Sequence, residues 1–335
     1  MRAVQCYAPA SLDNIRLVDL AEPVPPAANE ITIRIDASSL NYHDYAVVTG
    51  RLPTAGNRIP LSDAAGRVVA LGEGVNDFAI GDLAISLFFP LWADGRLPAA
   101  ASTQVPGDGV DGYACDAVTV PATWFTRAPS NYTASQAATL PCAAVTAWRA
   151  LVVNGRLGAG ESVLVLGSGG VSVFALQLAK AMGARVIATT SSNEKAQRLL
   201  ALGADHVINH REVPDWSKEV LKLTNGRGVD HIVETGGAGT LAQSIVASRS
   251  GGHIAMVGVL AGFAGPVNTA MIMRKQLRIE GLTVGSRKHQ LDLIDAIERL
   301  GLEPVIDSSF PLAEIANAFR YQESGKHLGK IIIEE

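Results

Sequence analysis

The chain has 335 residues, of which 48% are hydrophobic and 18% charged, and a formal net charge of −4. This length suits about two domains of ~150 residues, and the composition is typical of a folded protein. The slight acidity and the lack of a Lys/Arg run argue against nucleic-acid binding, and no apolar stretch approaches the ~20 residues that cross a membrane. We therefore expect a cytosolic protein with reduced cysteines that acts on a small molecule and has neither a nucleic-acid nor a membrane partner.

The first ~125 residues predict a β-rich domain. Short alternating segments such as ITIRIDAS at 31–38 and GRVVALG at 66–72 are separated by clusters of Pro, Gly and Asn. Residues 89–112 have no usable periodicity and are dense in Gly, Pro and Ala. We expect them to form a long surface loop.

From Thr133 onward, helices and strands alternate. Thr133 and Gln136 match a capping box that opens a helix, which Pro141 should interrupt. Continuously apolar strand candidates then follow, beginning at Ser162, Arg185, His206, Val229, Gly252 and Arg278. Six such strands with intervening helices predict an α/β fold with a doubly wound parallel sheet. The last ~50 residues are too short for a domain of their own and should return to the first one.

The segment VLVLGSGGVS at residues 163–172 joins an apolar strand to a glycine-rich loop. Gly167 permits the tight turn, and Gly169 allows the backbone to approach a pyrophosphate at the start of the next helix. Ser172 stands where the dinucleotide fingerprint has its third glycine. The pattern favours dinucleotide binding over an ordinary glycine turn.

The end of the second strand of this fold distinguishes NADH from NADPH. It reads ATTSSNEK, with Thr190 where an acidic residue would accept the ribose hydroxyl. Ser191, Ser192 and Lys195 could instead receive a 2′-phosphate, which favours NADPH. Alternatively, Ser191 and Glu194 form a capping box and Lys195 is a solvated helix residue.

Several motifs resemble the medium-chain dehydrogenase/reductase superfamily, in particular its zinc-free quinone oxidoreductase branch. They are LNYHDYAVVTG, DAAGRVVALGEGVNDFAIGD, LPCAAVTAWRAL, the glycine loop with its helix, LGADHVIN and HLGK. The resemblance implies a GroES-like catalytic domain formed by residues 1–128 and 285–335, and a Rossmann domain with a six-stranded parallel sheet at 129–284. It also implies a cofactor in the cleft between them and a homodimer, often made by the last strand of the sheet.

Where zinc-dependent relatives hold a catalytic metal with Cys, His and Cys, this chain has Asn41, Ser62 and Cys142. That set is a poor zinc shell, and only Cys115 matches the region of the relatives' structural zinc. We expect no zinc. Without a Lewis acid, a conjugated acceptor, which spreads the developing charge, is favoured over a simple ketone.

The resemblance places Asn41 beside the nicotinamide as the candidate catalytic residue, although Asn41 could merely tie down its loop. His43, Tyr42 or Tyr45 in the same turn could deliver a proton, but a solvated side chain is the more common outcome for a histidine there, and water could supply the proton instead. We expect Asp44 to orient the loop by hydrogen bonding. The predicted cofactor-binding residues are Asn41, Thr146, Gly167, Ser168, Gly169, Gly170, Val171, Thr190, Ser191, Lys195, His210, Thr235, Gly236, Gly258, Val259, Ser286 and Lys330.

The sequence therefore predicts an NADPH-dependent, zinc-free oxidoreductase that transfers hydride to an enone or a quinone. Two alternatives stay open: a zinc-independent alcohol or aldehyde oxidoreductase, and a catalytically idle NADPH-binding protein of crystallin type.

Overall fold

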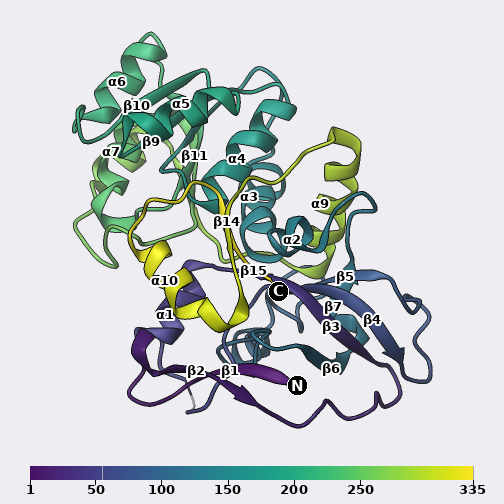
Figure 1. Cartoon of the computed structure of the whole chain (residues 1–335). Coiled ribbons are helices and arrows are strands. Elements are labelled where there is room, and N and C mark those ends of the chain that lie inside the picture. The colour runs from purple at the N-terminus through teal and green to yellow at the C-terminus, as the bar shows by residue number, and fades with distance from the viewer. Residues whose placement is uncertain (55, 335) are drawn as a thin grey trace. The chain divides into compact units, whose positions relative to one another are not determined.

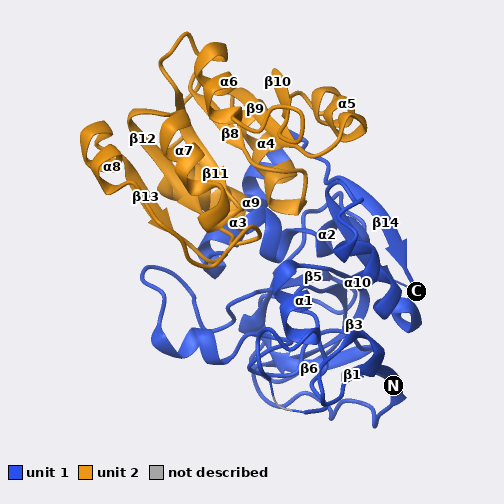
Figure 2. Cartoon of the chain, turned by 90° about the vertical axis from the view of Figure 1, so that its left-hand side faces the viewer, with its two compact units in different colours: residues 1–145, 284–335 blue, residues 146–283 orange. Residues whose placement is uncertain are grey.

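The computed structural model describes residues 1–54 and 56–334. The contacts between residues divide the chain into two compact units (Figures 1 and 2). Unit 1 comprises residues 1–145 and 284–335, and unit 2 comprises residues 146–283. The predicted domain limits, after residues 128 and 284, stay a prediction.

Unit 1 contains both ends of the chain, as Figure 2 shows in blue. Among the described residues, its larger sheet has the strand order β14-β15-β3-β4-β5-β7, and β6 also pairs with β3. The strands are β3 (Glu30–Ser39), β4 (Ala65–Leu71), β5 (Leu83–Ser86), β6 (Ala117–Pro121), β7 (Phe125–Arg127), β14 (Ile306–Phe310) and β15 (Lys330–Glu334). A separate antiparallel pair is formed by β1 (Arg2–Cys6) and β2 (Ile15–Asp19). The predicted β-rich domain is confirmed, as is the return of the C-terminal segment to it.

Helices in unit 1 are short, apart from one in the C-terminal segment. They are α1 (Tyr42–Val48), α2 (Ala134–Ala138), α9 (Arg287–Leu300) and α10 (Ile315–Glu323), with single 3-10 turns η1 (Leu12–Asn14), η2 (Ala99–Thr103), η3 (Ala122–Trp124) and η7 (Leu312–Glu314). Apart from η2, residues 89–112 form the predicted loop. The apolar core of the unit includes Ile31 and Ile33 of β3 and Phe125 of β7, all fully buried.

The capping box at Thr133 and Gln136 opens α2, as predicted. This helix ends at Ala138, before Pro141, and helical turns resume at Leu140, so the proline lies in the first turn of the next helical segment. Proline is tolerated there because the first turn of a helix has no intrahelical partner for its missing N–H. The turns continue as η4 (Leu140–Ala144), α3 (Val145–Trp148) and η5 (Arg149–Asn154), of which η4 and η5 are π-type.

Unit 2 is the doubly wound half of the chain. Its six described strands run parallel in the order β10-β9-β8-β11-β12-β13. They are β8 (Ser162–Val165), β9 (Arg185–Thr190), β10 (His206–Asn209), β11 (Val229–Glu234), β12 (Ser248–Met256) and β13 (Arg278–Gly281). This order is that of the dinucleotide-binding fold, so the predicted sheet is confirmed.

The helices that connect these strands are α4 (Gly170–Ala181), α5 (Asn193–Ala201), α6 (Trp216–Leu223), α7 (Leu241–Ala247) and α8 (Thr269–Lys275), with the 3-10 turn η6 (Gly237–Gly239). Leu164, Ile187, Ile232 and Ile254 of four neighbouring strands form the buried centre of the sheet. Because the strands are parallel, the loops that follow them gather at one edge, where α/β folds of this kind bind ligands. Within the described ranges, none of the helices is both long and apolar enough to cross a bilayer.

Candidate functional site

The glycine loop of unit 2 joins β8 to α4. Gly167 has a φ of +79°, a left-handed conformation that glycine adopts without strain. A Cβ atom added at Gly167 or Gly169 would meet nothing within 4 Å, so this side of the loop is open. Gly169 caps α4, whose first backbone N–H groups have no intrahelical acceptor. The loop therefore has the open backbone and free donors that a pyrophosphate requires.

Ser172 replaces the third glycine of the fingerprint without leaving a polar atom unpaired. Its side chain is buried, and its Oγ donates a hydrogen bond to the carbonyl of Leu166 at 2.6 Å. The Thr235 hydroxyl donates to the same carbonyl at 3.0 Å. Hydrogen bonds thus join the start of α4 and the loop after β11 to the end of β8. In the usual fingerprint the third glycine lets the helix pack closely on the strand, whereas here the serine holds the two together by a hydrogen bond.

Glu234 holds the loop after β11 and was not singled out in the sequence. It is completely buried, and its Oε1 accepts from the N–H groups of Gly236 and Gly237 at 2.8 and 3.1 Å. The hydroxyls of Thr240 and Ser244 also donate to this carboxylate. An acidic residue directly before two glycines at a strand end could have indicated such a loop anchor.

The end of β9 differs in one respect from the prediction. Ser192, and not Ser191, caps α5: its side chain accepts from the N–H of Lys195 at 3.2 Å. The alternative capping box of Ser191 with Glu194 is therefore wrong, and Ser191 is half-buried outside the cap. Thr190 Oγ1 is buried and has no hydrogen-bond partner among the described residues. Lys195 lies in the first turn of α5 with its side chain largely buried.

Other predicted residues of unit 2 follow the remaining strands. His210 is exposed just after β10, and its N–H donates to the Thr190 carbonyl at 2.9 Å. Gly258 and Val259 follow β12, and a Cβ atom at Gly258 would lie 2.6 Å from the Thr235 carbonyl oxygen, so this position requires glycine. The unit therefore brings to one edge of its sheet Gly167, Ser168, Gly169, Gly170, Val171, Thr190, Ser191, Lys195, His210, Thr235, Gly236, Gly258 and Val259. Thr146 lies buried in α3, outside these loops.

Unit 1 brings together Asn41 and Lys330, which are far apart in the sequence. Lys330 begins β15, is 3% exposed, and its Nζ donates to Asn41 Oδ1 at 2.6 Å and to the Leu40 carbonyl at 2.8 Å. Asn41 Nδ2 donates to Asp63 Oδ2 at 2.8 Å and lies 3.4 Å from Ser62 Oγ. Asn41 is thus held by a buried hydrogen-bond network. Its longest contact, from Nδ2 to Ser62 Oγ, is the one that a ligand could replace.

Asp63 is the negative charge of this network. It is fully buried, accepts from Ser39 Oγ at 2.8 Å, and lies 3.6 Å from Lys330 Nζ. Burial raises the pKa of Asp63 to about 6, although Lys330 opposes this rise. Burial also raises the pKa of the nearby Cys142 thiol well above its usual range.

Asp44 and Ser286 are two further buried polar residues of unit 1. Asp44 is buried in the first turn of α1 and accepts from the N–H groups of Asn41 and Ser62 at 2.8 and 2.9 Å. The predicted residue Ser286 is buried as the N-cap of α9, and its side chain accepts from the His289 N–H at 3.3 Å. The prediction that Asp44 orients this loop by hydrogen bonding is confirmed. Nothing in the sequence pattern pointed to Asp63 and Ser39 as partners of Asn41, because their contacts depend on the fold.

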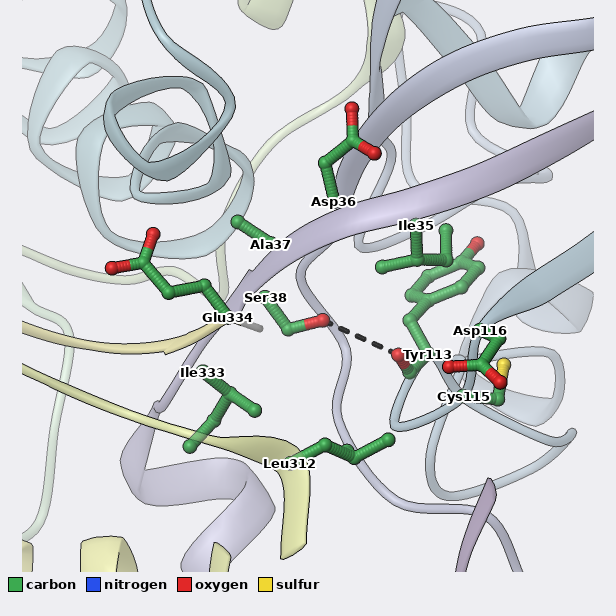
Figure 3. A pocket seen from close by; sticks show the side chains of 10 residues that line it. All are labelled: Ile35, Asp36, Ala37, Ser38, Tyr113, Cys115, Asp116, Leu312, Ile333 and Glu334. Atoms are coloured by element: carbon green, nitrogen blue, oxygen red, sulfur yellow. Dashed lines mark hydrogen bonds between the residues drawn. The ribbon is translucent and has the colours of Figure 1, made fainter. Parts of the chain in front are cut away.

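Two cavities of unit 1 lie away from these residues. The smaller one, of about 30 Å³, lies between β3, β15 and the segment that precedes β6. Figure 3 shows its lining, with Ser38 donating a hydrogen bond to the Tyr113 carbonyl. This cavity has the size of one or two water molecules and is too small for a substrate. The larger one, of about 310 Å³, lies beside Arg67 and Arg127, where Arg127 pairs with Asp82 at 3.2 Å.

Comparison with known proteins identifies the family. Residues 27–130 match the alcohol dehydrogenase GroES-like domain, and residues 170–309 match the zinc-binding dehydrogenase family. A zinc-type alcohol dehydrogenase-like protein of Schizosaccharomyces pombe is 37% identical over 97% of this chain and 96% of its own length.

Solved structures agree with this assignment. That of an NAD-dependent alcohol dehydrogenase is 33% identical, covers 100% of both chains and has a TM-score of 0.91. The quinone oxidoreductase of Escherichia coli, solved with NADPH, covers 100% of both chains with a TM-score of 0.85, and at 22% identity it shows the fold alone. The chain is therefore an oxidoreductase of the medium-chain dehydrogenase/reductase superfamily, and it has the fold of that superfamily's quinone oxidoreductase-like branch.

Proposed function

We propose that this protein is an NADPH-dependent, zinc-independent oxidoreductase that reduces the activated C=C bond of an enone, or a quinone. The observation that carries the proposal is the position of Lys330, whose ammonium group lies 2.6 Å from Asn41 Oδ1 and 3.6 Å from Asp63 Oδ2. The family resemblance puts Asn41 at one of the three positions where zinc-dependent relatives hold their metal.

A zinc ion does not fit this arrangement. Zinc prefers thiolate, imidazole and carboxylate ligands, whereas Asn41 and Ser62 offer an amide and a hydroxyl that contact each other. The ammonium of Lys330 already provides a positive charge there, and it would repel a divalent cation. Within residues 1–54 and 56–334, His, Cys, Asp and Glu side chains form no group of three that could hold a metal ion.

A pyridine dinucleotide does fit unit 2. The open face of the loop at Gly167 and Gly169 would take the pyrophosphate. Thr190 Oγ1, which has no hydrogen-bond partner within the described ranges, would take the 2′-phosphate of the adenosine ribose together with Ser191 and Lys195. When bound, NADPH supplies a hydride. This chain's own residues bind and orient: we place Asn41 at the reacting end of the substrate, where its amide would donate to the oxygen that gains charge.

A panel of acceptors tests the proposed reaction. We expect NADPH oxidation with enones and quinones at a kcat/KM about 100-fold above that with saturated aldehydes, because the proposed zinc-independent site would lack a Lewis acid that stabilises a localised alkoxide. Absorbance at the NADPH band measures it, and elemental analysis of the same active preparation should find substoichiometric zinc. A preference for saturated aldehydes would favour the alcohol or aldehyde oxidoreductase. Tight NADPH binding without turnover would favour an idle binding protein.

We further propose that the protein is a homodimer joined along the β13 edge of unit 2. β13 lies at the end of the strand order, so its outer edge has no neighbouring strand among the described residues. The chain between β12 and β13 carries exposed apolar side chains, with Phe263 and Met273 each 76% exposed. An exposed edge beside exposed apolar side chains is a common place for a second copy to bind.

We expect the double variant Phe263→Asp with Met273→Asp to be a monomer. Formation of the dimer would bury the new carboxylate of each substitution without a counter-charge in the proposed interface. Sedimentation velocity at several concentrations measures the change. The matched control is Ile80→Asp in unit 1, which replaces an apolar residue that is 69% exposed and should leave the dimer intact. A wild-type protein that sediments as a monomer at every concentration would contradict the proposal.

A further inference from the structure

His43 lies between two carboxylates. It belongs to the first turn of α1, and its side chain is 19% exposed, so it is not the solvated turn residue that the sequence suggested. His43 Nε2 lies 3.4 Å from Asp108 Oδ2, and Nδ1 lies 3.8 Å from Asp44 Oδ1. The ring also packs edge-on against Phe88 at 5.1 Å between centroids.

The two carboxylates keep this imidazole charged. Burial alone would lower the pKa of His43, but the contact with Asp108 and the negative charges of Asp108 and Asp44 together raise it to about 9. Asp44 faces the ring from α1 itself and Asp108 from the loop before β6, while the segment after β5 contributes the uncharged Phe88. At neutral pH both ring nitrogens therefore carry protons.

We propose that His43 is the proton donor of the reduction, and that it delivers the proton from Nε2. This inference rests on the proposed function, which places the substrate beside Asn41, two residues before His43. Nδ1 faces the buried Asp44, whereas Nε2 faces Asp108, whose side chain is 29% exposed. The contact between Nε2 and Asp108 is long for a hydrogen bond, so a substrate atom can compete for this proton.

The step balances in atoms and charge. The β-carbon of the enone gains the hydride with its two electrons, and the former C=C π electrons pass into the enolate. A C–H bond then forms at the α-carbon with the proton from Nε2, and the electron pair of the broken N–H bond stays on the ring. His43 is left neutral and regains its proton from water on the side of Asp108. The net reaction consumes one proton for each C=C bond reduced.

Asp44 is a positioning residue in this scheme. It accepts the N–H groups of Asn41 and Ser62, and it faces His43 Nδ1. The same carboxylate thus fixes the start of α1 and attracts the imidazolium through its charge, although the 3.8 Å contact is too long for a hydrogen bond.

The test combines titration of His43 with kinetics of the full-length enzyme, using His43→Gln and Asp108→Asn. Proton NMR of the imidazole C2–H groups, with His43 assigned by its absence in the glutamine variant, should give a pKa of about 9 without cofactor. We expect His43→Gln to lower kcat for an enone about 100-fold, the typical contribution of general acid catalysis, with an unchanged Kd for NADPH. Wild-type kcat should fall as the pH rises through about 9, because the acid form is lost.

Asp108→Asn keeps the test informative even if His43→Gln folds poorly, because Asp108 lies on a partly exposed loop. It should lower the pKa of His43 and move the alkaline limb of kcat to lower pH by the same amount. His206→Gln, in β10 of unit 2, is the matched control and should change neither quantity. Full kcat in His43→Gln, or a His43 pKa below 7, would overturn the inference alone. A wild-type enzyme that reduces no enone or quinone would overturn the proposed function and this inference with it.

Discussion

Lys330→Met is expected to lower the free energy of unfolding by about 3–5 kcal/mol, because it leaves the buried carboxylate of Asp63 without its counter-charge. Lys330 Nζ donates to Asn41 Oδ1 and to the Leu40 carbonyl, so both acceptors also lose a partner. Urea unfolding measures the loss. Lys326→Met, which removes an exposed lysine of the same C-terminal segment, should stay within about 0.5 kcal/mol of the wild type.

The double variant Lys330→Met with Asp63→Asn distinguishes the contribution of the ion pair to stability from the contribution of side-chain packing. It removes both charges, so we expect it to recover most of the lost stability.

The free energy of unfolding should also depend on pH through Asp63. The folded-state pKa of Asp63, about 6, lies above its usual value, so the protonated carboxyl favours the folded state at low pH. This contribution is lost as the pH rises through about 6.

In Lys330→Met the pKa of Asp63 should rise further, so the stability deficit should be larger at pH 8 than at pH 5. A deficit that is the same at both pH values, or that persists in the double variant, would contradict the ion-pair explanation. Activity offers a second readout. If Lys330 positions Asn41, its loss should reduce kcat/KM by about 100-fold, as displacements of about 1 Å at a reacting centre do.

The sequence predicted unit 2 well because its signals are local. Each apolar strand, the glycine loop and the absence of an acid at Thr190 lie within a few residues of one another, and the dinucleotide fold determines which strand ends meet. The choice of N-cap at α5 was wrong because Ser191 and Ser192 are equally suitable by residue type. Only the backbone angles decide, and these place Ser192 in the extended conformation of a cap.

The site in unit 1 was less predictable. Asn41 was identified by a family resemblance, but its partner Lys330 is 289 residues away, and the contact requires β15 to pair with β3. His43 and Asp108 are 65 residues apart, and Asp108 lies in a loop with no periodicity. When the two members of an ion pair are this far apart in the sequence, the local pattern around each one indicates an exposed, solvated charge. The burial that shifts its pKa arises only when the chain folds.

Lys195→Glu is expected to raise the Kd for NADPH roughly 10- to 100-fold and to change the Kd for NADH less than about 3-fold, since the substitution reverses one unit charge near a 2′-phosphate that only NADPH carries. The proposal relies on three features of the β9 end. No acid stands at Thr190, Ser191 is outside the cap of α5, and Thr190 Oγ1 is buried without a partner among the described residues. Fluorescence titration with each nucleotide measures the two constants.

Because the side chain of Lys195 is largely buried, a glutamate there could also disturb α5. This disturbance would raise the Kd for NADPH and the Kd for NADH by the same factor. Lys195→Gln separates the two effects: it keeps the length of the side chain, removes the charge and should give an intermediate loss for NADPH only. Lys218→Glu on the exposed face of α6 controls for the overall change in charge. Added salt should reduce the difference in Kd for NADPH between the wild type and Lys195→Gln, since salt screens the attraction of lysine for the 2′-phosphate. Equal losses for NADPH and NADH in both Lys195 variants would instead favour a cofactor without the 2′-phosphate, as in the NAD-dependent alcohol dehydrogenase that this chain resembles.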